Sequence, residues 1–224
     1  MHKALEDIPV RILNNAMGAL TQANTLAVYH DPGMEHRNDL CVLSAALAGE
    51  LFFKAIIADE HPLLLFKDLF HLDQPKNEVF DIERTIGSGR TYGFDHLPQL
   101  LWVTRGERLP DPTSFEAVRV ARNSVQHFCT PVGVNLRTIS LNFIYKNLDP
   151  LIKKYFDINA IEYHEDLSVS YDYVVSFLIG HELEFSIPDD FCVTEINLKQ
   201  ELSETSSGYQ SNFGRRLLDA EKKG

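Results

Sequence analysis

The stretch from Leu40 to Asp59 constrains the fold of this chain more than any other part of the sequence. It is long enough for about five turns of α-helix, and Asp39 or Asn38 can cap its start. Because apolar side chains occur on nearly every side of such a helix, other helices must cover it. The pattern therefore predicts a mainly all-α protein with this helix in the middle of a bundle. Its apolar residues are Leu40, Val42, Leu43, Ala45, Ala46, Leu47, Leu51, Phe52, Phe53, Ile56 and Ile57.

Further amphipathic segments supply the helices that cover it. Their apolar residues recur every three or four positions, which is the spacing of one helix face. Pro9 lies near the start of the first segment, where a helix tolerates proline, and Asp149–Pro150 predicts the start of a new helical turn. Together the segments predict a helical bundle over residues 1–157. They are residues 5–29, 63–72, 97–103, 114–127, 134–147 and 151–156.

The pattern changes after residue 157, and residues 158–224 are predicted to form a C-terminal extension of mixed helix and extended chain. Residues 167–178 fit both a helix and a strand, and we favour the helix. Residues 184–188 and 191–196 predict short extended segments or strands. A polar loop over residues 203–208 precedes a charged, weakly helical tail whose end is expected to fray.

Composition limits the classes of function. The 224 residues carry a net charge of −11 at pH 7, whereas proteins that coat nucleic acid without sequence preference are usually basic. The three cysteines, Cys41, Cys129 and Cys192, are widely spaced and predict no disulfide framework. Residues 1–7 do not look like a signal peptide, and no uninterrupted apolar run approaches the roughly 18 residues of a membrane span. We therefore expect a cytoplasmic protein with no membrane partner.

The predicted helix over residues 114–127 lies between Pro112 and Pro131. Thr113 and Glu116 have the spacing of a capping box at its start. Four apolar residues at helical spacing predict a stripe that faces the core. They are Val118, Ala121, Val125 and Phe128.

Three polar residues of this helix, Arg122, Asn123 and His127, are the candidate catalytic residues. Asn123 and His127 are four positions apart and share a face, while Arg122 lies about 140° round the helix from His127. Arginine offers a fork of donors that matches phosphate, and histidine transfers protons near neutral pH. The other histidines show no metal-ligand spacing, so we expect neither a metal nor a cofactor. The alternative is that Arg122 and His127 are merely polar flanks of a surface helix.

Glu50 and Lys54 are polar positions on the otherwise apolar helix. They are four residues apart with the glutamate first, which is the favourable order for an intrahelical ion pair. Such a pair either supports a catalytic site or has a structural role alone. The glycine-rich stretch 87–93 lacks the spacing of a phosphate-binding loop and predicts a flexible loop.

These features resemble the HEPN superfamily of small all-α proteins, many of which are metal-independent endoribonucleases. The family signature is an arginine, commonly followed by a polar residue such as asparagine, with a histidine a few residues further on. Arg122, Asn123 and His127 match this signature, and Glu50 and Lys54 match the Glu-x-x-x-Lys pair on the second helix of many members. The resemblance implies that His127 transfers the proton, Arg122 binds the phosphate, Asn123 orients these groups and Glu50 and Lys54 support them.

The resemblance, which covers roughly residues 5–157, also implies the products and partners. RNA would be cleaved to 2′,3′-cyclic phosphate and 5′-hydroxyl ends by a homodimer in which two Arg/His sets face one cleft. A toxin or defence role, with an antitoxin or regulatory protein as partner, is implied as well. Apart from the resemblance, local positive charge makes Arg105, Arg108 and Arg119 candidates for contacts to RNA, and Arg137 adds to the same charge.

A non-catalytic HEPN-like dimer that binds a protein or a nucleotide is the alternative. The acidic net charge favours that alternative, whereas the intact Arg122-Asn123-x-x-x-His127 pattern favours the ribonuclease.

Overall fold

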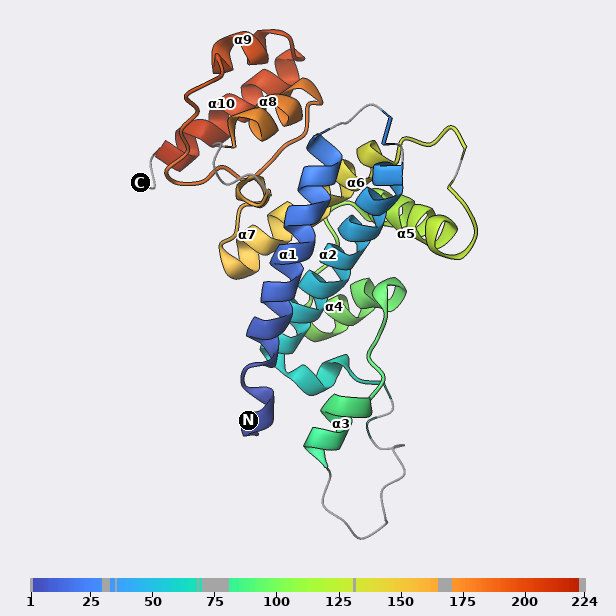
Figure 1. Cartoon of the computed structure of the whole chain (residues 1–224). Helices are drawn as coiled ribbons and strands as arrows, with labels where there is room; N and C mark the ends of the chain where they lie inside the picture. Colours follow the sequence, from blue (N-terminus) through green and yellow to red (C-terminus); the bar gives the residue numbers. More distant parts are fainter. Residues whose placement is uncertain are drawn as a thin grey trace. The chain divides into compact units, whose positions relative to one another are not determined.

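The computed structural model describes residues 2–29, 33–34, 36–67, 69, 81–130, 132–164 and 171–221. These residues are mainly helical and contain no strand (Figure 1), which confirms the predicted mainly all-α fold. The chain separates into two compact units: unit 1 is residues 1–18 and 47–109, and unit 2 is residues 19–46 and 110–224. The predicted boundary at residue 157 falls inside unit 2 and stays a prediction.

Two long helices contribute to both units. Helix α1 spans Ile8–Val28 with Pro9 in its first turn, as predicted, and α2 spans His36–Glu60. The all-round apolar pattern of α2 predicted a buried helix, and Phe52, Phe53 and Ile56 are fully buried. By length and composition α2 could also cross a membrane, but 67% of its most apolar window is buried inside the protein. A core helix of a folded domain meets the same criteria.

In unit 1, α2 is followed by a single 3-10 turn, Pro62–Leu65. The helix predicted over residues 63–72 is therefore wrong at Phe66, whose backbone is extended and pairs with Thr91 in an isolated antiparallel bridge. Most of the remainder of that stretch lies outside the described residues. Pro62 favours the start of a helical turn. The helix does not continue past Leu65, because the backbone on either side of Phe66 is hydrogen-bonded to the segment after α3 (Ile82–Ser88).

The glycine-rich stretch of unit 1 is ordered by this bridge. Lys67 N donates to Arg90 O at 2.8 Å, and Tyr92 N donates to Leu65 O at 2.9 Å. A Cβ atom at Gly89 would lie 2.6 Å from the Phe66 ring and 2.5 Å from Thr85 O, so this position requires glycine. The flexible loop predicted for residues 87–93 is instead the end of α3 and one side of the bridge. A 3-10 turn, Phe94–His96, then leads into α4, Leu97–Arg105.

Unit 2 continues with α5 (Pro112–His127), α6 (Leu136–Phe143) and α7 (Asp149–Phe156). A π-helical segment, Ile144–Leu148, joins α6 to α7 without a break. The separate helical start predicted at Asp149–Pro150 is thus wrong. Proline has no N–H and clashes with the carbonyl four residues earlier in an α-helix, and a wider π turn before Pro150 accommodates it.

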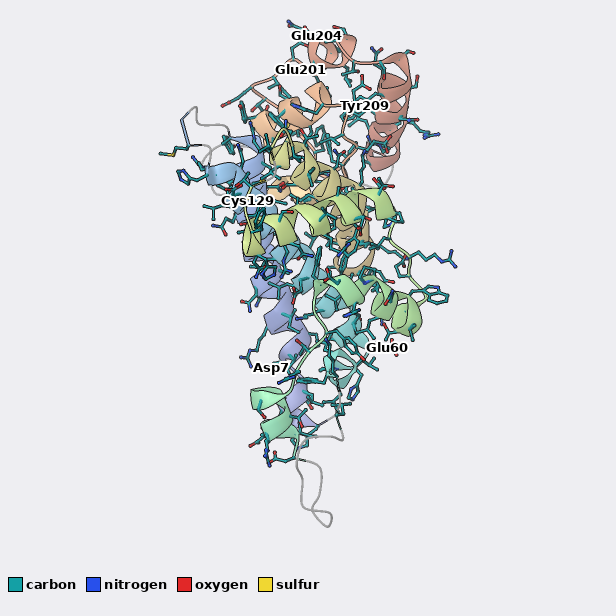
Figure 2. The ribbon with its side chains drawn as sticks, turned by 90° about the vertical axis from the view of Figure 1, so that its right-hand side faces the viewer. Asp7, Glu60, Cys129, Glu201, Glu204 and Tyr209 are labelled. Carbon is teal, nitrogen blue, oxygen red and sulfur yellow. The ribbon has the colours of Figure 1, made fainter. Side chains whose placement is uncertain are left out.

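The C-terminal part of unit 2 holds α8 (Asp172–Gly180), α9 (Leu198–Ser203) and α10 (Ser207–Glu221), which form the orange-to-red group in Figure 1. Helix α8 confirms the helix favoured over residues 167–178 for residues 172–178, while residues 167–170 lie outside the described residues. The tail that we expected to fray forms α10 through Glu221. Its side chains Tyr209 (labelled in Figure 2) and Phe213 are buried and anchor this helix. The described chain holds no strand at residues 184–188 or 191–196. Backbone N–H groups there donate to side chains from other parts of unit 2. Thr194 N and Glu195 N, for example, donate to the carboxylate of Asp172.

A buried polar network crosses the core of unit 2. Asn24 Nδ2 donates to the carbonyls of Ala160 and Tyr163 at 2.7 and 2.9 Å, and its oxygen accepts from the Tyr145 hydroxyl at 3.0 Å. The carboxylate of Asp149 accepts from Ala160 N at 2.9 Å and from Ser186 N. Burial raises the pKa of Asp149, although these two hydrogen bonds oppose the shift.

Candidate active site

Helix α5, which carries the predicted catalytic residues, begins with a strong N-cap. Asp111 accepts from Thr113 N at 3.0 Å and from Ser114 N at 3.4 Å, and Pro112 occupies the first helical position. The capping box predicted from Thr113 and Glu116 is therefore wrong. The first turn of a helix tolerates proline. The N-cap residue is therefore Asp111, which precedes Pro112, and not Thr113, which follows it.

One face of α5 is fixed in the core of unit 2. Ser114, Phe115, Val118 and Ala121 are buried, and the Phe115 ring lies 6.2 Å from that of Phe143. Asn147 Nδ2 strengthens this contact by donating to Ser114 Oγ and to Asp111 O at 2.6 and 2.8 Å. The core face therefore fixes the rotation of α5 and determines which residues point away from the core.

The predicted apolar stripe of α5 ends earlier than expected. Val125 is only partly buried, and Phe128 is 89% exposed. The reason is that α5 ends at His127, so Phe128 takes a non-helical backbone conformation and leaves the core face. Figure 2 labels Cys129, the next residue, which is also exposed. Val132 is fully exposed, so apolar side chains face solvent directly after His127.

Arg122 and Asn123 form a pair on the partly exposed side of α5. Arg122 Nη1 donates to Asn123 Oδ1 at 2.9 Å. No carboxylate in the described chain pairs with Arg122. One guanidinium hydrogen bond holds the side chain in place, while the other four N–H groups stay available to an acceptor such as a phosphate.

His127 occupies the last turn of α5 and is exposed. Within the residues that the structure describes, neither ring nitrogen has a hydrogen-bond partner. The imidazole is therefore accessible to solvent and to a ligand. The predicted residues Arg122, Asn123 and His127 thus lie within two turns of one helix, and each side chain keeps unused hydrogen-bonding capacity.

The arginines predicted to gather round this site have other partners. Arg119 donates to Glu116 through both Nε and Nη2, at 2.8 and 2.6 Å, and this hydrogen bonding lowers the pKa of Glu116. Arg137 donates to the carbonyls of Ala27 and Val28 at the end of α1. Arg105 and Arg108 belong to unit 1, so the structure does not group them with the site on α5.

Glu50 and Lys54 also belong to unit 1. Lys54 Nζ lies 2.7 Å from Glu50 Oε1 and donates to Thr91 Oγ1 at 3.2 Å. Their side chains are 21% and 13% exposed, respectively. The predicted ion pair is thus formed, and Lys54 also links α2 to Thr91 in the isolated bridge. Its supporting role in catalysis stays a prediction.

The arrangement on α5 can bind an anion and transfer a proton. Arg122 supplies fixed positive charge, Asn123 supplies an amide that holds the guanidinium, and His127 supplies an accessible imidazole. Over the described ranges, no three His, Cys, Asp or Glu side chains cluster as ligands of a metal ion.

Comparisons of this chain with known families, curated proteins and solved structures found no match.

Proposed function

We propose that this protein is a metal-independent endoribonuclease of the HEPN type, with Arg122, Asn123 and His127 as its catalytic residues. One observation carries the proposal: a guanidinium with no acidic partner in the described chain and an exposed imidazole lie within two turns of α5, in the order that the family signature requires.

In the proposed reaction, Asn123 holds the guanidinium of Arg122, and the other two groups act on the RNA. His127 takes the proton of a ribose 2′-hydroxyl, and the 2′-oxygen attacks the adjacent phosphorus. The bond from phosphorus to the 5′-oxygen breaks, and that oxygen receives a proton from an acid. Arg122 binds the phosphate oxygens, on which charge develops in the transition state. The products are a 2′,3′-cyclic phosphate and a 5′-hydroxyl.

The acid in this scheme is His127 of a second copy of the chain. One imidazole then acts as base while the other acts as acid, as general acid–base catalysis requires. The proposal therefore includes a homodimer. A role as toxin or defence enzyme in the cytoplasm, under the control of another protein, completes it.

Cleavage of RNA by the purified protein in the presence of EDTA tests the proposal. We expect the wild type to produce cyclic-phosphate ends and Arg122→Ala and His127→Ala to produce none. Arg119→Ala is the matched control, because Arg119 lies on the same helix but is engaged by Glu116. Loss of cleavage in the control alone, or cleavage by all variants at the wild-type rate, would refute the assignment.

A non-catalytic binding module is the second candidate function. The exposed Phe128 and Val132, directly after the motif, favour it because apolar side chains in solvent commonly mark contact surfaces. This candidate predicts that the wild type leaves RNA intact while Phe128→Ser releases a bound protein partner.

A further inference from the structure

Trp102 is the only tryptophan of the sequence, and it lies on the surface of unit 1. Its side chain is 53% exposed, and its neighbour Val103 is 74% exposed. The guanidinium carbon of Arg108 lies 5.6 Å from the centre of the indole ring. An indole is costly to leave in water, so this exposure is unusual for a residue that serves the fold alone.

The local sequence holds the indole in this position. Leu97 and Leu101 are fully buried and fix one face of α4 in the core. Gly106 ends the helix in a left-handed conformation (φ 67°), and its N–H donates to Trp102 O at 2.9 Å. This cap reverses the chain and brings Arg108 back over the ring.

The end of α4 is also anchored by charge. Arg105 donates to Asp59 Oδ2 at 3.2 Å and to Glu60 Oε2 at 2.6 Å. Figure 2 labels Glu60. The single positive charge of Arg105 thereby offsets one of the two negative charges at the end of α2.

A hollow of about 430 Å³ continues the exposed side of α4. Its wall includes Tyr92, and Lys67 Nζ lies 5.4 Å from the centre of that ring. His96 and Gln99 add hydrogen-bonding groups, and no carboxylate is among the residues described as lining it. Val103, the exposed neighbour of Trp102 on α4, also lines the hollow. In a chain of net charge −11, α4 thus carries Trp102 with its cation Arg108 and borders a hollow that holds Tyr92 with its cation Lys67.

We infer that this surface of unit 1 binds single-stranded RNA. We call it the Trp102 surface and define it as Lys67, Tyr92, His96, Gln99, Trp102 and Arg108. Bases stack on Trp102 and Tyr92, while Arg108 and Lys67 contact phosphates. Aromatic platforms with adjacent cations bind single strands in this way, because every base has a face that can stack. The inference rests on the proposed function only in taking RNA as the ligand.

Binding of a single strand that cannot be cleaved tests the inference directly. The probe is a fluorescein-labelled 2′-O-methyl oligonucleotide of about ten nucleotides, a length within the usual site size of such platforms. Its blocked 2′-oxygen cannot attack phosphorus. We expect saturable quenching of the fluorescence of Trp102 and a matching rise in the anisotropy of the label. A duplex of the same sequence should bind more weakly, because its bases are already stacked.

Variants locate the binding on the Trp102 surface. We expect Trp102→Ala to weaken binding about tenfold, as loss of one stacked base does, and Trp102→Tyr to retain most of the affinity. Arg108→Gln should weaken binding severalfold and lower its salt dependence, because one phosphate contact is lost. Arg11→Gln is the control: Arg11 is an exposed arginine of unit 1 that pairs with Asp7, away from the Trp102 surface residues in sequence.

Three outcomes would overturn the inference: no binding by the wild type, equal affinity of Trp102→Ala, or self-association that Trp102→Ala abolishes. The last result would identify the surface as a contact between protein chains. The test is independent of cleavage. Binding without cleavage would support the Trp102 surface and refute the proposed reaction. Cleavage together with unchanged binding by Trp102→Ala would support the reaction and refute the Trp102 surface.

Discussion

Two groups of polar side chains in unit 2 differ in how fully their hydrogen bonds are satisfied. Asn24, Tyr145 and Asp149 are buried, and the structure gives each side chain protein partners. Arg122 and His127 are at least partly exposed and keep donors or acceptors without protein partners. Burial makes an unsatisfied polar group costly, so the first group serves the fold, while the second group can serve a ligand.

This comparison separates stability from activity within one unit. Changes in the buried network should lower the free energy of unfolding and leave the chemistry of folded molecules intact. Changes at the exposed end of α5 should lower the rate of the reaction and leave the free energy of unfolding unchanged.

The largest expected effect is on catalysis. His127→Ala should lower the rate of RNA cleavage about 1,000-fold, the usual contribution of a general acid or base. Its thermal unfolding should match the wild type, because the side chain is exposed and makes no hydrogen bond in the described part of the chain. Initial cleavage rates and circular dichroism melting measure the two quantities. A large fall in melting temperature would mean that His127 belongs with the structural group.

The next largest effect is on stability. Asp149→Ala leaves the N–H groups of Ala160 and Ser186 without an acceptor in the core. We expect a loss of about 3 kcal/mol in the free energy of unfolding, measured by urea denaturation at neutral pH. Cleavage per folded molecule at low temperature should stay unchanged. A fall in that specific rate at full folding would contradict the separation of the two groups.

Asp149 should also give the stability a pH dependence. Burial raises its pKa above the ordinary 3.8, so the native carboxyl binds its proton more tightly than the unfolded one. Between these two pKa values the native state holds more protons, and stability falls as pH rises. The contribution is fully present below 3.8 and is lost as pH rises through the native pKa.

Urea denaturation of the wild type and of Asp149→Asn over a series of pH values measures this dependence. Asparagine does not titrate there, so the stability of the wild type relative to the variant should decrease with rising pH. An increase would show that the two backbone hydrogen bonds outweigh desolvation.

The sequence predicted well those features that a single helix determines. The burial of α2 follows from apolar residues on all its sides, and the Glu50–Lys54 pair follows from spacing within one helix. The grouping of Arg122, Asn123 and His127 on α5 has the same local origin. Where α8 is found, the spacing fitted both a helix and a strand, so the helix that we favoured there was not decided by periodicity.

Features set by distant parts of the chain were not predictable in this way. Asn24 and Asp149 are isolated polar residues in the sequence, and only the fold shows that they meet the backbone of Ala160. The exposure of Phe128 depends on its non-helical backbone after the end of α5, whereas the apolar spacing alone placed Phe128 on the core-facing stripe. Trp102 gave no signal because exposure of a single aromatic residue is decided by tertiary packing.

The smallest expected effect comes from Arg119, which resembles Arg122 in type and helix but not in its partners. Glu116 already engages both Nε and Nη2 of Arg119, so this guanidinium offers a phosphate less than Arg122 does. Arg119→Gln should therefore leave the cleavage rate and the melting temperature close to those of the wild type, since exposed ion pairs contribute little. It should raise the pKa of Glu116 towards its ordinary 4.5, because the hydrogen bond that lowers it is lost. NMR titration of the Glu116 carboxyl measures this. If cleavage instead fell as far as in Arg122→Ala, engagement by a carboxylate would not distinguish structural from catalytic arginines on α5, and the comparison between satisfied and unsatisfied groups would fail.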